Sequence, residues 1–350
     1  MQKIDNIEIK NFKSIRHQRI DGCKRVNVFI GYPNTGKSNL IEAIGMFTSI
    51  RIKDEYFKFN DLCRVKHFSE LFFNKDYREA TNITINNKLL LELIINSSND
   101  LEIRIHTLVD HVGNLDRDSK FSAKINNRDF EYKDSTNTPE SNYNYIVSPI
   151  RKYEFKSDGI INQQRPFTLA VPFGANLLDI LQRDSNLRQE IAAIFEEYKL
   201  KLFIDGEEIK FLKYLSDGTG ISIPYHQVAD TLRRLLFYKA AILSNKQTVL
   251  LFEEPEAHMF PPYIAKFTSD IIFDKNDNQY FIATHSPFVL NDFMEDMDKD
   301  DLSIYVVGLK DGETVVRKLT DEEITEIYQY GIDLFFNLES YLKDGFINNA

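Results

Sequence analysis

The chain has 350 residues, of which 43% are hydrophobic and 27% charged, a balance typical of globular proteins. No stretch approaches the ~20 successive apolar residues of a membrane helix, and the N-terminus lacks the apolar core of a signal peptide, so we expect a cytoplasmic protein with no membrane partner. The formal net charge of -10 argues against a generally basic nucleic-acid-binding protein, and two cysteines are too few for a disulfide framework or a zinc site.

The first part of the chain predicts strands around a glycine-rich turn. Its N-terminal residues alternate as strands do, and the apolar run over 26–30 ends at Gly31. From Ser38 onward the apolar residues return at helical spacing. Residues 82–132 predict antiparallel strands joined by polar turns, and residues 133–144 predict an exposed loop.

The second part predicts a helix and then a return to α/β patterning. Residues 176–200 have helical spacing, and a hairpin follows with its turn at Asp205 and Gly206. Beyond residue 228 helices alternate with two apolar strands. We therefore expect an α/β fold with a mixed sheet, an antiparallel β lobe and a helical insertion. The expected parts are an N-terminal lobe over 1–135, the insertion over 136–224 and a C-terminal lobe over 225–350.

The segment GYPNTGKS matches the pattern G-x-x-x-x-G-K-[ST] of a phosphate-binding P-loop. In this motif backbone N–H groups surround phosphate oxygens, and the following helix presents its positive N-terminal end to the same charge. A chance match on a turn before a helix is the alternative, and the strand–loop–helix context argues against it. We assign ATP and Mg²⁺ as ligands, with Ser38 on the metal. The expected nucleotide-binding residues are Gly31, Asn34, Thr35, Gly36, Lys37, Ser38 and Asn39.

Two further apolar strands end in polar side chains. The run VLLFEEPE ends in Glu253 and Glu254, and the run YFIATHSP ends in His285, 31 positions after Glu254. That spacing fits one β-α-β unit, whose parallel strands would bring both ends to the same edge as the P-loop. One carboxylate could hold Mg²⁺, the next could orient the attacking water, and a neutral imidazole could contact the γ-phosphate. A solvated acidic turn and a surface histidine are the alternatives.

Together GYPNTGKS, LLFEEPEAH and FIATHSP, in this order, resemble the head domain of ABC-type P-loop ATPases of the SMC and RecF group. Within that group the chain most resembles OLD-like (AAA_15/AAA_21-type) ATPases of bacterial anti-phage systems. The resemblance implies that Lys37 and Ser38 are Walker A residues, Glu253 the magnesium-binding residue, Glu254 the catalytic glutamate and His285 the switch histidine. It also implies a D-loop and an ATP-dependent homodimer or higher oligomer. The D-loop residues are Glu256, Ala257 and His258.

The chain departs from this family pattern at three places. Glu253 stands where the family has an aspartate, which lengthens the ligand by one methylene. The usual Q-loop glutamine is absent, and His67 is a weak candidate for its role. The signature motif is either the segment 215–219, which fits by composition, or Asp230 and Thr231, which fit better because they open the helix before the strand of Glu253. An aspartate there would repel phosphate unless a cation or an arginine such as Arg233 pairs with it.

The resemblance and the remaining residues leave several functions open. Only 65 residues follow His285, too few for the nuclease domain of OLD nucleases, and the acidic run over 295–301 is most simply a solvated loop. We expect an ATPase that dimerises with ATP and controls a separate effector, such as a nuclease, in anti-phage defence or DNA repair. An ATP-gated DNA clamp is the alternative, because residues 1–70 carry 13 Lys and Arg against 8 Asp and Glu. A small-molecule phosphotransferase fits the paired glutamates less well.

Overall fold

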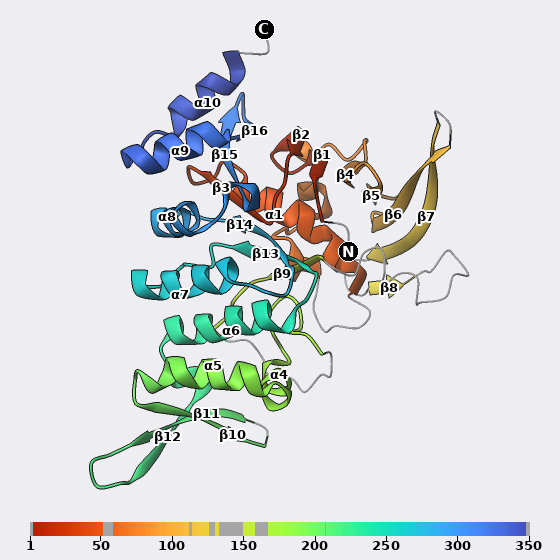
Figure 1. The fold of residues 1–350 in the computed structure, drawn as a ribbon. Coiled ribbons are helices and arrows are strands. Elements are labelled where there is room, and N and C mark those ends of the chain that lie inside the picture. Colours follow the sequence, from red (N-terminus) through yellow and green to blue (C-terminus); the bar gives the residue numbers. More distant parts are fainter. Residues whose placement is uncertain are drawn as a thin grey trace.

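The computed structural model describes residues 3–51, 59–111, 114–125, 130–132, 150–157, 167–206 and 208–347. The loop expected over 133–144 lies outside these ranges. A six-stranded sheet, in the order β16-β15-β3-β14-β13-β9, lies at the centre of the fold (Figure 1). All its neighbouring pairs are parallel except β15 and β16. Its strands are β3 (Val26–Gly31), β9 (Ile150–Tyr153), β13 (Val249–Glu253), β14 (Gln279–Ala283), β15 (Leu302–Lys310) and β16 (Glu313–Lys318).

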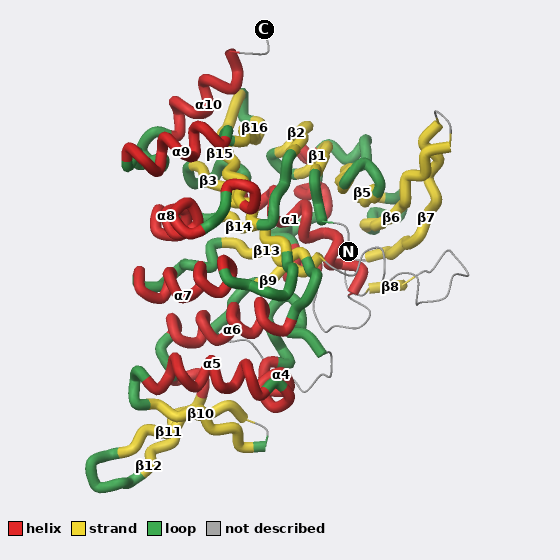
Figure 2. Tube along the Cα trace, viewed as in Figure 1, coloured by secondary structure: helices red, strands yellow, loops and turns green. Residues whose placement is uncertain are grey.

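The central strands are mostly apolar in sequence because helices cover both faces of the sheet. Every residue of β3, β13 and β14 is buried, which is the pattern of a parallel sheet with two covered faces. Helix α1 contacts β9, β13 and β14. On the other side α5 to α8 lie side by side (Figure 2). The helices are α1 (Lys37–Gly45), α5 (Ser185–Glu196), α6 (Asp230–Ser244), α7 (Pro261–Ile272) and α8 (Pro287–Asp296).

Aromatic side chains join the sheet to this helical layer. The ring of Phe252 on β13 lies 5.3 Å from that of Tyr238 on α6 and 5.8 Å from that of Phe267 on α7. The rings of Tyr238 and Phe267 are also in edge contact, at 5.4 Å. Such pairs add about 0.5–1.5 kcal/mol each beyond the burial of their area. The strand that ends in the two glutamates is therefore firmly fixed.

The predicted antiparallel lobe is a seven-stranded sheet in the order β2-β1-β4-β5-β6-β7-β8. Side chains from its β1–β2 turn reach the central sheet, since the hydroxyls of Ser14 and Thr314 on β16 lie 2.7 Å apart. The strands are β1 (Asn6–Phe12), β2 (Ile15–Asp21), β4 (Thr81–Ile85), β5 (Leu89–Ile95), β6 (Leu101–His111), β7 (Asn114–Ile125) and β8 (Phe130–Tyr132). Short helical turns lie between α1 and β4, namely η1 (Met46–Arg51), α2 (Phe59–Leu62), η2 (Phe68–Leu71) and η3 (Phe73–Lys75).

A third sheet packs on α5 at one end of the molecule. Its strands are β10 (Leu200–Asp205), β11 (Glu208–Tyr214) and β12 (Gly220–Pro224), so the predicted hairpin with its turn at Asp205 and Gly206 is present. Phe195 of α5 stacks on Phe211 of β11 with ring centroids 4.1 Å apart. The other elements are α4 (Leu177–Arg183), η5 (Tyr225–Gln227), η6 (Lys299–Asp301), α9 (Asp321–Tyr330) and α10 (Leu338–Ile347). Within the ranges given above, no helix has the length and apolarity needed to cross a membrane.

The single helix expected over 176–200 is two helices, α4 and α5, which meet at Asp184. The Asp184 carboxylate accepts hydrogen bonds from the backbone N–H groups of Asn186 and Leu187 and so caps α5. We expect Asp184→Ala to lower the free energy of unfolding by about 1 kcal/mol, measured by urea denaturation. Asp184→Asn keeps the acceptor and is the matched control. Equal stability of the alanine variant and the wild type would contradict the capping role.

Candidate active site

The P-loop connects β3 to α1, and its two glycines are required by their neighbours. A Cβ on Gly31 would lie 2.2 Å from the backbone oxygen of Val307 on β15. Gly36 has a φ of 99°, and a Cβ there would lie 2.1 Å from Thr314 Oγ1. The Thr35 hydroxyl donates to the Tyr32 carbonyl at 2.8 Å and closes the loop. A side chain at either glycine would therefore force the loop away from β15 and β16.

Lys37 is buried, and its ammonium donates to the carbonyls of Gly31 at 3.0 Å and Tyr32 at 2.9 Å. Burial lowers the pKa of Lys37 to about 8, and the carboxylates of Glu254, Glu253 and Glu256 oppose this shift. Because such opposition requires proximity, the end of β13 and the P-loop share one electrostatic environment.

Glu254 and His285 meet at the same edge of the sheet. Glu253 is paired in register with Ala283, and the Glu254 N–H donates to the Ala283 carbonyl at 2.8 Å. The Glu254 and His285 side chains are 3.5 Å apart, measured from Oε1 to Nε2. Burial and then the Lys37 ammonium lower the pKa of His285, which leaves its imidazole neutral at pH 7 although Glu254 opposes the shift. The strand ends expected to converge from the sequence do so.

Glu256 holds the segment that carries His285. Its Oε1 accepts hydrogen bonds from the Thr284 hydroxyl at 2.6 Å and from the His285 N–H at 3.0 Å. Burial raises the pKa of this carboxyl, and these hydrogen bonds oppose the shift. Next to it, Ala257 donates its N–H to the Glu254 carbonyl at 3.0 Å. The predicted D-loop thus fixes the backbone on both sides of the Glu254–His285 pair.

The candidate signature residues also contact this loop within one chain. Asp230 opens α6, and its carboxylate accepts hydrogen bonds from Arg233 at 3.2 Å and from Arg234 at 2.8 Å. Thr231 donates its hydroxyl to the His258 carbonyl at 2.9 Å. The alternative signature segment over 215–219 forms the exposed turn between β11 and β12, which lie beyond α5 at one end of the molecule (Figure 1). The choice of Asp230 and Thr231 over the segment 215–219 stays a prediction, because the signature would act on the nucleotide of a second copy.

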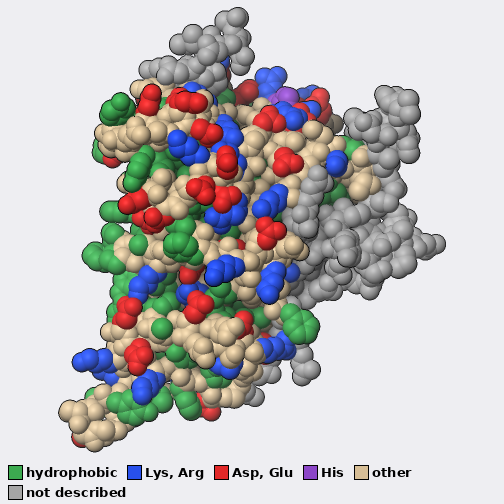
Figure 3. Space-filling model, in the orientation of Figure 1, with side chains coloured by type: hydrophobic (Ala, Val, Ile, Leu, Met, Phe, Trp, Pro, Cys, Tyr) green, Lys and Arg blue, Asp and Glu red, His purple; other side chains and the backbone are tan. Residues whose placement is uncertain are grey.

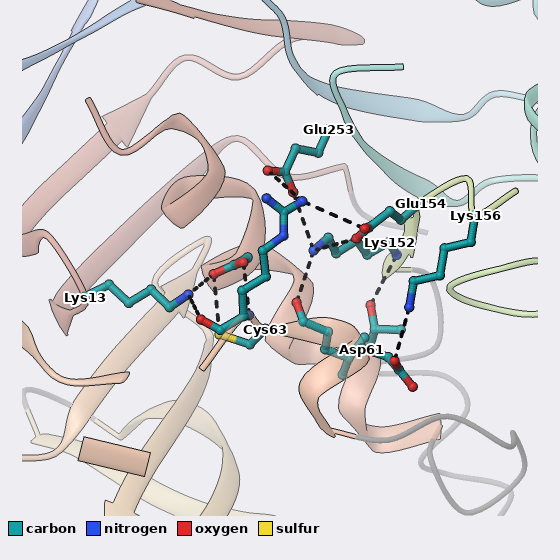
Figure 4. A network of polar contacts seen from close by, with 11 residues as sticks. Lys13, Asp61, Cys63, Lys152, Glu154, Lys156 and Glu253 are labelled. Carbon is teal, nitrogen blue, oxygen red and sulfur yellow. Dashed lines mark hydrogen bonds and ion pairs between the residues drawn. The ribbon is translucent and has the colours of Figure 1, made fainter. Parts of the chain in front are cut away.

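Two basic residues that the sequence did not single out surround Glu253. Arg64 Nη2 lies 3.3 Å from Glu253 Oε1, and Lys152 Nζ lies 3.7 Å from Glu253 Oε2 (Figure 4). His67, the candidate for the missing Q-loop residue, precedes η2, and among the described residues its side chain makes no hydrogen bond or ion pair with Lys37, Glu253 or His285. No local pattern in the sequence marks either residue, because Lys152 depends on the pairing of β9 with β13 and Arg64 on the contact of its backbone with Glu42.

The residues near the P-loop fit a magnesium ion. Glu253 Oε2 is buried without a hydrogen-bond partner in the described part of the chain, although Lys152 lies within ion-pair distance. Ser38 follows Lys37 in the first turn of α1 and is half-buried. A carboxylate and a hydroxyl are oxygen ligands of the kind that Mg²⁺ prefers. By contrast, the Asn39 amide donates to Ser14 Oγ at 2.6 Å, which ties α1 to the β1–β2 turn.

The acidic run over 295–301 is not part of this site. Most of its residues are exposed, and Asp301 accepts a hydrogen bond from Arg25 at 2.9 Å. Among the described residues, no group of three or more His, Cys, Asp or Glu side chains is arranged to hold a metal ion. The two cysteines are free, and Cys63 is buried next to Glu42.

The chain is similar in sequence to a known family and to individual proteins. Residues 26–291 match a family model, AAA_21, described as "AAA domain, putative AbiEii toxin, Type IV TA system". The chain is 23% identical over 339 residues to an ATP/GTP phosphatase of Helicobacter pylori, which covers 85% of this chain and 88% of that protein. It is 34% identical over 94 residues to protein ea59 of Escherichia phage lambda, covering 26% of this chain and 16% of that protein.

Solved structures share the fold. One is an SMC head bound to the C-winged helix domain of ScpA, with a TM-score of 0.52, 15% identity and coverage of 93% of this chain and 100% of that one. Another is an Smc head domain with an extended coiled coil bound to the C-terminal domain of ScpA derived from Pyrococcus furiosus, with a TM-score of 0.53 and 14% identity. That alignment covers 94% of this chain and 99% of the other. The predicted head fold is thereby confirmed.

Proposed function

This chain belongs to the AAA_21 family, and from that premise we propose that it binds and hydrolyses ATP at the site formed by Lys37, Glu254 and His285. The family match and the relative named as an ATP/GTP phosphatase support ATP hydrolysis. The observation that carries the residue roles is the convergence of three strand ends. Strand β14, which precedes His285, pairs in parallel with both β3, which ends at Gly31, and β13, which ends at Glu253, and the Glu254 and His285 side chains lie 3.5 Å apart.

The proposed mechanism divides the work among these side chains. Backbone N–H groups of the P-loop and the Lys37 ammonium hold the β- and γ-phosphates. Glu254, which is half-exposed, positions the attacking water and accepts its proton. The neutral His285 imidazole donates a hydrogen bond to the γ-phosphate or to that water. Mg²⁺, when bound, neutralises phosphate charge, and Ser38 and Glu253 are the residues that would hold it.

We infer that two copies of the chain dimerise around ATP. The nucleotide of the second copy would meet a surface formed by the start of α6 and the D-loop. The residues of this surface are Asp230, Thr231, Glu256, Ala257 and His258. Their support is the family resemblance and the hydrogen bond between Thr231 and the His258 carbonyl. The arginines that pair with Asp230 reduce its repulsion of phosphate.

The dimer leads to a direct prediction. We expect Glu254→Gln with ATP to elute at twice the monomer mass in size-exclusion chromatography with light scattering, because ATP persists when hydrolysis is slowed. With ADP the same variant should elute as a monomer, and Lys37→Ala should do so with either nucleotide. A monomer of Glu254→Gln at saturating ATP and high protein concentration would contradict ATP-dependent dimerisation.

The resemblance also suggests a biological role for the ATP-driven dimer. We propose that the ATP-driven dimer controls a separate effector, such as a nuclease, in anti-phage defence or DNA repair, as the resemblance to OLD-like ATPases implies. The SMC heads of similar fold bind ScpA in their own structures, which is a precedent for a head acting through another protein. Co-expression with the products of neighbouring genes tests this proposal, because an effector partner should have its activity switched by ATP. An unchanged partner activity with ATP, ADP and Glu254→Gln would argue against it.

A DNA clamp is less well supported. The cleft beside β1 and β2 contains Lys10, Arg16 and His17, but Asp76 and Glu313 also line it. On the face in Figure 3, basic and acidic side chains are interspersed rather than gathered into a basic stripe. Phosphate binding requires clustered positive charge. Salt-dependent binding to a DNA duplex, weakened by Arg16→Ala, would favour the clamp.

A further inference from the structure

Glu253, the proposed magnesium ligand, lies between two cations of different mobility. Its side chain is 4% exposed, with Arg64 at 3.3 Å from Oε1 and Lys152 at 3.7 Å from Oε2 (Figure 4). A buried carboxylate needs a counter-charge, because an unpaired charge in the interior is strongly unfavourable. Either cation can supply this charge. Only the Arg64 side chain is exposed and can move away from the carboxylate into water.

Lys152 is fixed. Its side chain is 1% exposed, it lies on β9 opposite Leu251 of β13, and its ammonium donates to the Leu62 carbonyl at 3.1 Å. Glu154 lies 3.8 Å from the same ammonium. Moving Lys152 away would leave Glu253 and a buried carbonyl without their partner. We therefore expect Lys152 to stay next to Glu253 when a nucleotide binds.

Arg64 has an anchored backbone and an exposed side chain. Its N–H donates to Glu42 Oε1 at 3.3 Å, and its carbonyl accepts from the Lys13 ammonium at 3.3 Å. Glu42 belongs to α1, so the backbone of Arg64 is tied to the helix that follows the P-loop. The side chain is 62% exposed, and its other acidic neighbour, Glu154, is 3.8 Å away. The guanidinium can return to water at little loss, as exposed ion pairs contribute little.

We propose that Arg64 is a displaceable cap on Glu253. Its guanidinium neutralises the carboxylate when no nucleotide is bound and leaves when Mg²⁺ arrives with ATP, while Lys152 remains. Arg64 and the metal ion compete for the Glu253 carboxylate, so the arginine raises the magnesium concentration that the site requires. The proposal rests on the proposed ATP site and adds a residue that sets how readily its metal binds. Arg64 acts through Glu253 and is a positioning residue.

The test measures metal binding without turnover. Mn²⁺, which accepts the same oxygen ligands as Mg²⁺, is titrated into protein with a non-hydrolysable ATP analogue, and free Mn²⁺ is followed by electron paramagnetic resonance. We expect Arg64→Gln to bind Mn²⁺ about two- to five-fold more tightly than wild type, the range that an exposed ion pair allows. Arg64→Lys retains a cation and should bind more weakly than Arg64→Gln. Arg16→Gln removes an exposed arginine paired with Glu313 elsewhere and is the matched control.

Two outcomes would overturn the cap. Equal Mn²⁺ affinity in Arg64→Gln and wild type would show that no competition exists. Weaker binding of Mn²⁺ or of the analogue in Arg64→Gln would show that Arg64 supports the ligand directly. If the wild type and Arg16→Gln bind the analogue, the nucleotide site exists and only the cap has failed; if neither binds it, the proposed function has failed. Thermal unfolding of each variant checks that Arg64→Gln is folded, and Arg64→Lys provides a second variant if it is not.

Discussion

Lys37→Ala is expected to weaken ATP binding by one to two orders of magnitude and to abolish detectable hydrolysis. The ammonium lies inside the P-loop, where it now donates to two backbone carbonyls and where burial lowers its pKa to about 8. A charge-assisted hydrogen bond contributes about 1.5–3 kcal/mol, and each 1.4 kcal/mol is a factor of ten in affinity. Fluorescence titration with a labelled ATP analogue measures the loss, and release of phosphate measures hydrolysis.

Two variants separate this effect from unfolding. Lys37→Met keeps the buried aliphatic stem and should lose binding as Lys37→Ala does, while its thermal unfolding stays close to that of the wild type. Lys246→Ala removes an exposed lysine far along the chain and should bind ATP normally. Retention of wild-type ATP affinity by both Lys37 variants would mean that the loop over 31–38 does not hold phosphates.

Glu254→Gln is expected to reduce kcat by about 10²- to 10⁴-fold with little loss of ATP affinity. Glutamine keeps the shape of the side chain but cannot accept the proton of the attacking water, and a general base contributes rate enhancements of that size. The neighbouring imidazole cannot replace it fully, because its depressed pKa makes it a weak base that binds its proton poorly. Single-turnover hydrolysis with excess enzyme isolates the chemical step.

Two further variants, one far from the site and one within it, serve as controls for Glu254→Gln. Glu326→Gln changes an exposed carboxylate on α9 and should leave kcat unchanged. His285→Ala should also slow hydrolysis, but less than Glu254→Gln, because it removes a hydrogen bond and no base. A Glu254→Gln variant that hydrolyses ATP at the wild-type rate would remove Glu254 from the role of base.

The parts of the site that lie on successive strands could be predicted from the sequence. A parallel sheet brings the carboxyl ends of its strands to one edge, so the apolar runs before Gly31, Glu253 and His285 were enough to place them together. The P-loop was predictable because its chemistry is local. The start of α6 at Asp230 followed from helix periodicity.

The surroundings of Glu253 could not be predicted in the same way. Lys152 reaches it only because β9 pairs with β13, and β9 lies in the range expected to be an insertion. Arg64 reaches it because the segment after α2 is held against Glu42 by contacts that no periodicity encodes. The boundary between α4 and α5 lies at Asp184, a residue type that caps helices. The helical spacing of apolar residues continues across this boundary and hides it. The division into lobes over 1–135, 136–224 and 225–350 remains a prediction.

The contact of the P-loop with β16 makes the segment after α8 part of the proposed nucleotide site. The Thr314 hydroxyl donates to the Thr35 carbonyl at 3.0 Å and lies beside Ser14, while Val307 of β15 borders Gly31. A fragment that ends between α8 and β15 would keep every motif residue. It would still lose the two strands, β15 and β16, against which the P-loop packs. Supplying residues 300–350 as a separate peptide should then restore nucleotide affinity to the truncated protein.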